Sequence, residues 1–321
     1  MWVEDAVRVS VWGVEVYRFG LFAALGAAAC LLVLKWTLDK RSAPRGTAAL
    51  CGVFMLLLGA ALARLLYMFT DASLRAIPSF QAFIHLETGG YSMFGALTGA
   101  VLGCLAGGKM TKVKAGDAAD CAAPALAAFV LFERLGEKGT GLGHSRTLMH
   151  APLFSFLTVQ GEYGQYLATF YLEAGVALIL LCVLLWDFGR KRRRGDTALA
   201  GLLLFGCTQV VLESLRFDRH MRFSFISVQQ ILAFVCVCAA IIVFSVRALR
   251  CGKRVLPVFS LVYLALLMGA LILIEFAIDR SGVDNRILYA IYVALAAVPC
   301  VTGLKMRAVT ERTEKNESQR H

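Results

Sequence analysis

Long apolar stretches separated by short polar segments run along almost the whole chain. Each stretch has about 17 to 25 residues, the length that an α-helix needs to cross roughly 30 Å of hydrocarbon. The stretches lie at 14–36, 47–69, 89–107, 117–134, 166–187, 197–215, 225–247, 255–278 and 286–305. The pattern therefore predicts an all-α fold, a polytopic helical membrane protein in which these stretches are the transmembrane helices.

The composition indicates the same class. Hydrophobic residues make up 59% of the 321 residues and charged residues 17%, a balance that a soluble surface cannot accommodate. The formal net charge is +11. We attribute this charge to membrane topology and to contact with anionic lipid headgroups, and nothing in it argues for nucleic acid as a partner.

Every second predicted loop is basic. The loops after the first, third, fifth and seventh stretches contain Lys40, Arg41 and Arg45; Lys109, Lys112 and Lys114; Arg190 to Arg194; and Arg247, Arg250, Lys253 and Arg254. Cytoplasmic loops collect Lys and Arg. We therefore expect the N-terminus outside and the C-terminus in the cytoplasm.

Cysteines and histidines do not suggest a metal site. Most of the 10 cysteines lie inside predicted spans without a CxxC pair, so we interpret them as buried small hydrophobic residues. The 5 histidines show no metal-ligand spacing. We expect neither a metal nor another cofactor.

Charged side chains inside the spans are the first candidates for a functional site, because each costs roughly 2.5 to 3.5 kcal/mol at the membrane centre. The span at 117–134 runs directly into four charged residues, and Glu173 lies early in the span at 166–187. The four residues are Glu133, Arg134, Glu137 and Lys138. We expect Arg64, Arg134, Glu213 and Arg216 to share one site. In contrast, we interpret Glu15, Arg18, Glu275 and Asp279 as helix-end residues whose side chains reach the lipid headgroups.

Six short blocks occur in a fixed order within residues 1–247. They are VYRFGL at 16–21, ARLLY at 63–67, GGYSMFGALTG at 89–99, Asp120 and Pro124 followed by RLG at 134–136, ESLRFD at 213–218, and ISVQQIL at 226–232. Together they resemble the motifs of the prolipoprotein diacylglyceryl transferases. These bacterial inner-membrane enzymes attach a diacylglyceryl group to the lipobox cysteine of lipoprotein precursors.

The resemblance implies a division of the chain. Residues 1–247 are expected to form a transferase-like domain of seven transmembrane helices. Residues 248–306 then add two C-terminal helices, and 307–321 form a polar cytoplasmic tail that is disordered or a frayed helix. The resemblance also implies a location in the bacterial inner membrane, among membrane lipids.

The implied reaction moves a diacylglyceryl group from phosphatidylglycerol to the cysteine thiol of a lipoprotein precursor, while a glycerol phosphate leaves. Guanidinium groups suit an anionic phosphodiester because they bind it bidentately. The substrate-binding residues that remain in register with the family motifs are Arg64, Arg134, Gly136, Arg216 and Gln230.

Five polar positions of the family motifs are changed in this chain. Phe19 stands for a Tyr, Phe94 for a His, Glu137 for an Asn, Leu142 for a Glu and Gln209 for an Arg. A phenylalanine cannot accept the proton of the attacking thiol. We therefore take Glu137 and Glu213 as the candidate catalytic bases.

Three alternatives remain open. Glu137 pairs with Lys138 in a loop at the membrane surface, or Glu213 pairs with Arg216 three residues further along a helix. The third is a catalytically silent relative that binds phospholipid or lipoprotein precursors. The glycines of 89–103 are expected to let two helices approach closely, whereas those of 136–143 break a helix and line the site.

Overall fold

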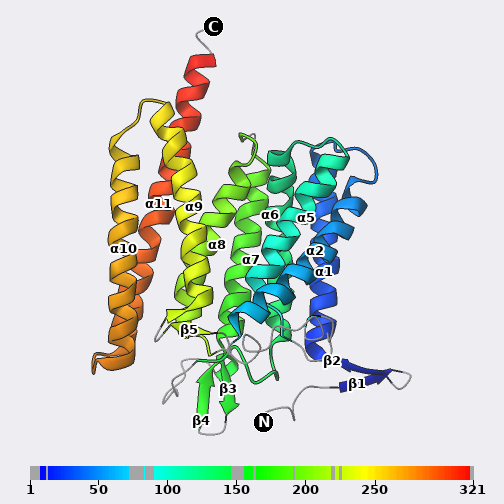
Figure 1. The fold of residues 1–321 in the computed structure, drawn as a ribbon, viewed down its shortest axis with the longest axis vertical. Helices are drawn as coiled ribbons and strands as arrows, with labels where there is room; N and C mark the ends of the chain where they lie inside the picture. The colour runs from blue at the N-terminus through cyan, green and yellow to red at the C-terminus, as the bar shows by residue number, and fades with distance from the viewer. Residues whose placement is uncertain are drawn as a thin grey trace. The chain divides into compact units, whose positions relative to one another are not determined.

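The computed structural model describes residues 8–11, 14–71, 83, 90–145, 155–161, 164–190, 192–217, 221–223 and 226–318. Within these ranges 9 helices are long and apolar enough to cross a membrane, which confirms the predicted fold class (Figure 1). The chain forms two compact units, Met1–Ala198 with Leu215–Met221 and Leu199–Ser214 with Arg222–His321. The domain boundary expected at residue 247 stays a prediction.

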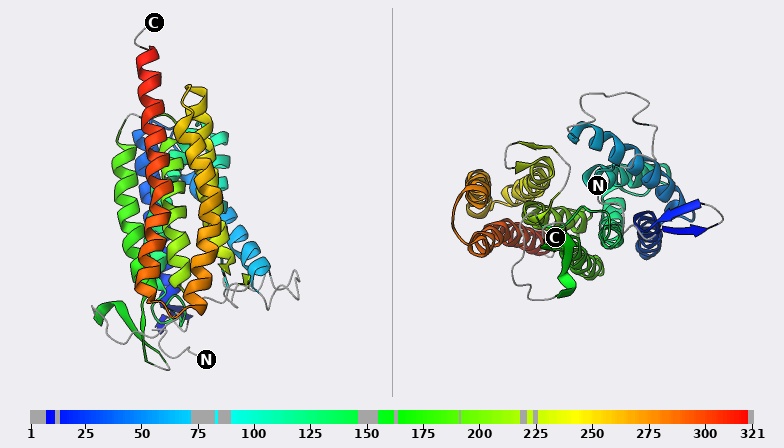
Figure 2. Two further views of the ribbon diagram at one scale, coloured as in Figure 1. Left: turned by 90° about the vertical axis from the view of Figure 1, so that its left-hand side faces the viewer. Right: turned by 90° about the horizontal axis from the view of Figure 1, so that it is seen from below.

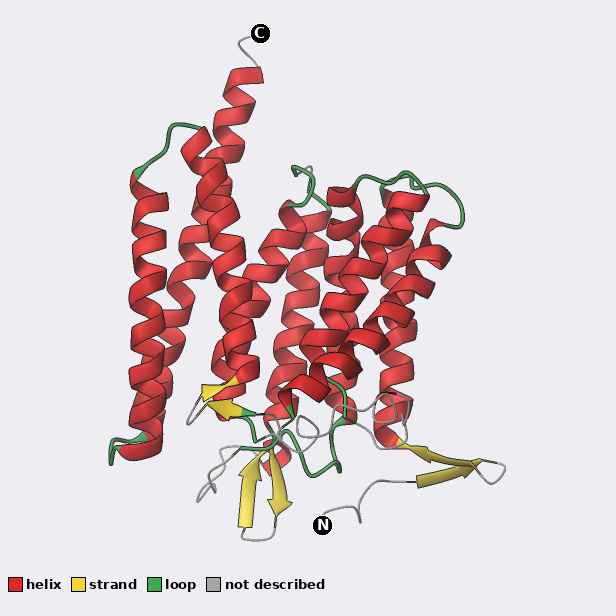
Figure 3. Cartoon of the chain, in the orientation of Figure 1, coloured by secondary structure: helices red, strands yellow, loops and turns green. Residues whose placement is uncertain are grey.

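Five long helices and two hairpins belong to the first unit. The helices are α1 (Arg18–Lys40), α2 (Thr47–Thr70), α5 (Met93–Met110), α6 (Ala115–Gly136) and α7 (Thr169–Phe188). Strand β1 (Arg8–Val11) pairs with β2 (Val14–Tyr17), and β3 (Thr158–Gly161), which follows the short helix η2 (Ser155–Leu157), pairs with β4 (Gly164–Leu167). Both hairpins lie at the same end of these helices (Figure 3).

Four helices begin later than the sequence predicts: α5 begins at Met93 rather than at 89, and three others follow a strand. The expected starts at 14, 166 and 225 fall in or just before β2, β4 and β6 (Ile226–Ser227), and the helices begin at Arg18, Thr169 and Val228. Residues 14–17 alternate Val, Glu, Val and Tyr, which is the period of a strand. An average of hydropathy over a long window hides this alternation.

Glycines bring α2 and α5 into backbone contact. A Cβ added at Gly95, Gly99 or Gly103 would overlap the backbone of α2, and one at Gly107 would lie 2.7 Å from the Cα of Cys51. Only glycine permits this approach, because any larger side chain would hold the two helices apart. The predicted packing role is confirmed for Gly95, Gly99 and Gly103, whereas Gly89 lies outside the described residues.

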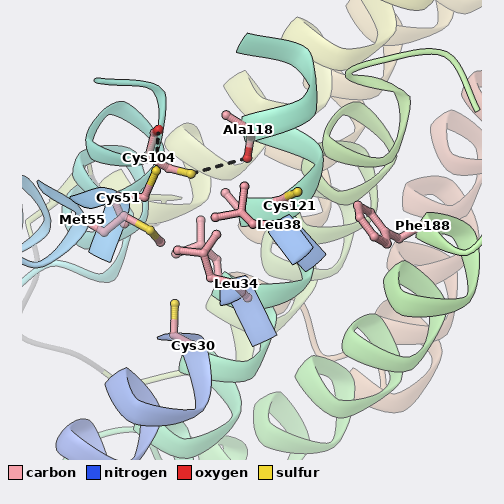
Figure 4. Close-up of a cluster of buried hydrophobic side chains, with 13 residues drawn as sticks. Cys30, Leu34, Leu38, Cys51, Met55, Cys104, Ala118, Cys121 and Phe188 are labelled. Atoms are coloured by element: carbon pink, nitrogen blue, oxygen red, sulfur yellow. Dashed lines mark hydrogen bonds between the residues drawn. The ribbon is translucent and has the colours of Figure 1, made fainter. Parts of the chain in front are cut away.

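Cysteine, alanine, leucine and methionine side chains of α1, α2, α5 and α6 form a buried core together with Phe188 of α7 (Figure 4). The thiol of Cys51 donates to the carbonyl of Cys104 at 3.5 Å, and the thiol of Cys104 donates to the carbonyl of Ala118 at 3.5 Å. All of the cysteines are free thiols, and Cys30 and Cys121 complete the buried sulfur atoms of this core. The interpretation as buried residues is therefore correct for these four cysteines and wrong for Cys182, which is exposed.

Asp120 joins α6 to the start of α8 (Asp196–Leu215). Its two carboxylate oxygens accept hydrogen bonds from the backbone N–H groups of Gly195, at 2.8 Å, and Ala198, at 2.9 Å. These N–H groups have no partner inside α8, since they belong to its cap and first turn. Asp120 lies 14 residues before Arg134, about 21 Å along the helix, so its role is structural and separate from that of Arg134.

Replacing Asp120 with Ala is expected to lower the free energy of unfolding by about 2 kcal/mol, the upper range for loss of an N-terminal cap. Thermal unfolding of the purified protein in detergent measures the change. Asp117→Ala is the matched control on the same helix. Its partner Arg194, at 2.9 Å, is half-exposed, so this loss should stay below about 0.5 kcal/mol. Equal losses for the two variants would contradict the capping role.

The second unit consists of the remainder of α8, the hairpin of β5 (Arg222–Phe223) and β6, and the helices α9 (Val228–Arg250), α10 (Val255–Arg280) and α11 (Asn285–Ser318). The last three helices lie side by side (Figures 1 and 2). Helix α11 continues well past 305, and Met306 and Arg307 are buried. Residues 307–318 are thus helical, and disorder is the wrong alternative for them.

A buried polar group connects α9 to α10 and α11. The side-chain N–H groups of Gln230 donate to Glu275 at 2.5 Å and to the hydroxyl of Tyr292 at 2.9 Å. Glu275 is only 2% exposed, so its interpretation as a side chain that reaches the headgroups is wrong. Its charge is instead satisfied inside the protein, as buried carboxylates require. Asp279, one turn further, is exposed as predicted.

Candidate functional site

The C-terminal end of α6 carries the guanidinium at the centre of the candidate site. Arg134 is buried in the last turn of α6, and its Nη1 donates to Oε1 of Glu137, the residue that follows the helix. Its Nε lies 2.6 Å from Oε2 of Glu173 and 3.4 Å from Oε2 of Glu133. Arg134 therefore contacts three carboxylates.

A second guanidinium shares two of these carboxylates. Arg216 follows α8 in an extended conformation. Its Nη2 donates to Oε1 of Glu137 at 2.5 Å, and its Nη1 donates to Oε1 of Glu173 at 2.8 Å. Glu137 and Glu173 thus each connect Arg134 to Arg216, and we call these four residues together with Glu133 the charged cluster.

The backbone of residues 143–145 holds the elements of the cluster together. Ser145 forms an antiparallel β-bridge with Arg216, and the N–H of Phe217 donates to the backbone carbonyl of His144 at 2.8 Å. The carbonyl of Gly143 accepts from the N–H of Phe170 at 3.0 Å, at the start of α7. This loop therefore fixes Arg216 and the first turn of α7, which carries Glu173 one turn later.

The segment before α5 lies between Arg64 and Arg134. Arg64 is buried in α2, and its Nη1 donates to the carbonyl of Gly90 at 3.0 Å. The sulfur of Met93 accepts from Nη2 of Arg134 at 2.7 Å. Residues 90–93 thus contact both Arg64 and Arg134, which the sequence predicted to share one site. Arg64 donates its hydrogen bond to a backbone carbonyl, however, and not to a carboxylate of the cluster.

Gly136 lies where α6 meets α1. A Cβ at this position would come 2.7 Å from the Cβ of Phe22. Close helix packing is therefore sufficient to explain glycine here, and its predicted contact with substrate stays a prediction. The glycines that follow, Gly139, Gly141 and Gly143, have φ of +88°, +70° and +72°, as expected for residues that break the helix.

Glu213 and Gln230 belong to the second unit. Glu213 is buried in α8. Gln230 closes a capping box with Ser227 at the start of α9, and its amide also binds Glu275 and Tyr292. Protein groups therefore occupy its hydrogen-bonding atoms, and its role as a substrate ligand stays a prediction.

The local ion pair considered for Glu137 does not describe the cluster. Lys138 is exposed, whereas Glu137 is buried and binds both arginines. Arg216 follows α8 in an extended conformation, and the pair of Glu213 with Arg216 stays a prediction. Among the changed family positions, Phe94 is buried in the first turn of α5 and Gln209 is buried in α8.

Glu133 and Glu173 are the members of the cluster to which the sequence assigned no catalytic or substrate-binding role. The side chain of Glu173 is 0% exposed, and Glu173 is the acidic residue of the N-terminal half of α7. That signal, a lone carboxylate at membrane depth, was available from the sequence. What the sequence could not supply was the pair of arginines it binds.

One polar atom of the charged cluster has neither a hydrogen bond nor an ion pair among the described residues. Oε2 of Glu137 is buried without a hydrogen bond, whereas Oε2 of Glu133 and Oε2 of Glu173 are paired with Nε of Arg134 by charge alone. Two adjacent guanidinium groups with buried carboxylates can bind an anion at the donors and transfer a proton at the carboxylates. Buried polar atoms without partners are costly and are typical of functional sites.

Comparison with known proteins agrees with the motifs. The model of the prolipoprotein diacylglyceryl transferase family matches residues 6–246, so α10 and α11 lie beyond it. A phosphatidylglycerol–prolipoprotein diacylglyceryl transferase of Oceanobacillus iheyensis is 22% identical over 266 residues, covering 78% of this chain and 91% of that protein. One of the same name from Clostridium kluyveri is 25% identical over 266 residues, covering 78% and 99%. Since the family match extends over well more than half of the chain, the chain belongs to the prolipoprotein diacylglyceryl transferase family.

Proposed function

We propose that this multi-pass membrane protein moves a diacylglyceryl group from phosphatidylglycerol to the lipobox cysteine of a lipoprotein precursor. The observation that carries the proposal is the meeting of Arg134 and Arg216, which come from distant parts of the sequence and share the same two carboxylates. Paired guanidinium groups are the donors that a phosphodiester requires. The names of the relatives supply the two substrates.

In the proposed reaction the two guanidinium groups bind the phosphodiester of the lipid. Glu137 accepts the proton of the cysteine thiol, and Glu213 is the second candidate for this role. The sulfur then forms a bond to the glyceryl carbon while the bond from that carbon to the phosphate oxygen breaks. The glycerol phosphate leaves with the electron pair, and Arg134 and Arg216 stabilise the charge that grows on it. Arg64, Gly136 and Gln230 are the further proposed substrate-binding residues.

We further propose that the protein lies in the bacterial inner membrane with the N-terminus outside and the C-terminus in the cytoplasm. The basic loops support this orientation. In the first unit, Arg41, Lys112 and Arg194 all lie at the end of the helices away from the charged cluster. Under the positive-inside rule this end faces the cytoplasm, and the cluster then lies near the outer leaflet.

A catalytically silent relative is the second candidate function. One observation favours it: Glu137 and Glu173 already occupy Nη atoms of both arginines. A protein of this kind would bind phospholipid or a lipoprotein precursor without transferring the diacylglyceryl group.

Complementation separates these two functions. We expect the chain to restore growth to cells depleted of their own transferase, with diacylglyceryl-modified lipoprotein detected by mass spectrometry. Arg216→Lys keeps the charge but loses the planar pair of donors, so the lipidation rate should fall about 100- to 1,000-fold, the usual cost of one donor to a developing anion. Arg194→Ala, a half-exposed arginine at the opposite end, is the control and should lipidate normally. Normal membrane expression without any lipidation would favour the silent relative.

A further inference from the structure

One oxygen of Glu137 accepts from both guanidinium groups. Nη1 of Arg134 and Nη2 of Arg216 both donate to its Oε1. A phosphodiester oxygen that bound the same two arginines would need the same donors. The carboxylate and the phosphate therefore compete for one position.

Glu137 and the other carboxylate that connects the arginines differ in their place in the fold. Glu173 lies inside α7 with a side chain that is 0% exposed, and each of its oxygens contacts an arginine. Glu137 is instead the C-cap of α6, and it contacts both arginines through Oε1. The glycines after it, with positive φ, start the loop that leaves the helix. Glu137 can thus turn away while Glu173 stays in place.

Exchange of Glu137 for phosphate conserves the charge of the site. With every group ionised, the three carboxylates and two guanidinium groups of the cluster sum to −1. Removal of one carboxylate and binding of one phosphodiester leaves this sum unchanged, so neither arginine is buried unpaired at any stage. An anion that entered without the exchange would instead raise the negative charge of a buried site.

Resting on the proposed function, we infer that Glu137 is the internal competitor that sets the affinity for anionic lipid: phosphatidylglycerol binds by displacing its carboxylate from Arg134 and Arg216. An internal competitor acts at an effective concentration of about millimolar or more. The affinity for the lipid is therefore lower than that of the two arginines alone. The displaced carboxylate no longer binds either arginine, so it is available for the thiol proton.

Binding and turnover should change in opposite directions in Glu137→Gln. The amide cannot compete as an anion, so phosphatidylglycerol should bind about tenfold tighter, the change expected for one charge-assisted interaction. It cannot accept the thiol proton either, so kcat should fall while KM falls. Native mass spectrometry of the detergent-purified protein, titrated with phosphatidylglycerol, measures the affinity. Glu137→Asn, which restores the residue of the family motif, is the second variant if Glu137→Gln does not fold.

Glu133→Gln is the matched control. It removes one negative charge from the same cluster, 3.4 Å from Arg134, but does not lie between the two arginines. Its affinity should change less than about threefold, as for a general change of charge. The inference would be overturned if both variants gained the same affinity for phosphatidylglycerol, or if Glu137→Gln gained none. Tighter binding by Glu137→Gln in a protein that never lipidates would support the exchange and refute the transferase, whereas lipidation with unchanged affinity would do the reverse.

Discussion

Replacing Glu173 with Ala should cost about 3 to 5 kcal/mol of folding free energy, the range for removal of one partner from a buried ion pair. The side chain is 0% exposed and contacts Nη1 of Arg216 at 2.8 Å and Nε of Arg134 at 2.6 Å. Without it, Glu137 is the remaining carboxylate that connects the two arginines. The midpoint of thermal unfolding in detergent, followed by tryptophan fluorescence, measures the loss.

Glu133→Ala is the control for this loss. Glu133 contacts the same Nε of Arg134, but at 3.4 Å and with a side chain that is 14% exposed. Its removal leaves Arg134 paired with two carboxylates and should cost less than about 1 kcal/mol. If Glu133→Ala destabilised the protein as much as Glu173→Ala, the stability of the charged cluster would depend on its total charge and not on the contact of one carboxylate with both arginines.

The sequence was sufficient to predict the helices because hydropathy alone determines which segments can enter a membrane. It failed at the helix ends. Three predicted starts fell in or just before strands, since a short alternating hairpin is almost as apolar as a helix. The end of α11 was predicted too early, at 305, because its last turns are polar yet continue to Ser318.

The residues of the candidate site were less predictable from the sequence than the helices. Arg134, Glu137 and Arg216 were found through motif order and spacing, and the structure brings them together. Glu275 was assigned wrongly because its proximity to a helix end is visible in the sequence, whereas its partner Gln230 lies 45 residues away. Contacts of this kind depend on which helices pack together, and hydropathy does not encode that choice.

The retained and changed family positions differ in what they contact. Arg134 and Arg216 bind the same carboxylates, so each depends on the other's position. Glu137, where the family motif has an Asn, is the carboxylate that binds both arginines through a single oxygen. The change thus adds a negative charge at the place where an anionic lipid would bind, and substrate affinity is the property that we expect it to alter most.

Gly99→Val should destabilise the first unit by about 3 kcal/mol or more, at or above the upper range for overpacking a core. A Cβ at this position would lie 2.8 Å from the Cα of Gly59 and still closer to the carbonyl oxygen of Leu58. Both obstacles are backbone, so no rotamer of a neighbouring side chain relieves the clash. Helices α2 and α5 must separate, and the segment that joins Arg64 to Arg134 moves with α5. Unfolding temperature in detergent and the yield of folded protein measure the effect.

Gly175→Val in α7 is the matched control, because nothing described lies within 4 Å of a Cβ at that position. The same substitution there adds the same side chain to a transmembrane helix without a clash, so its effect should stay within about 1 kcal/mol. Since α5 also positions Met93 against Arg134, Gly99→Val should reduce lipidation along with stability, and Gly175→Val should leave both near wild type. A stable Gly99→Val protein would mean that α2 and α5 do not meet through this glycine.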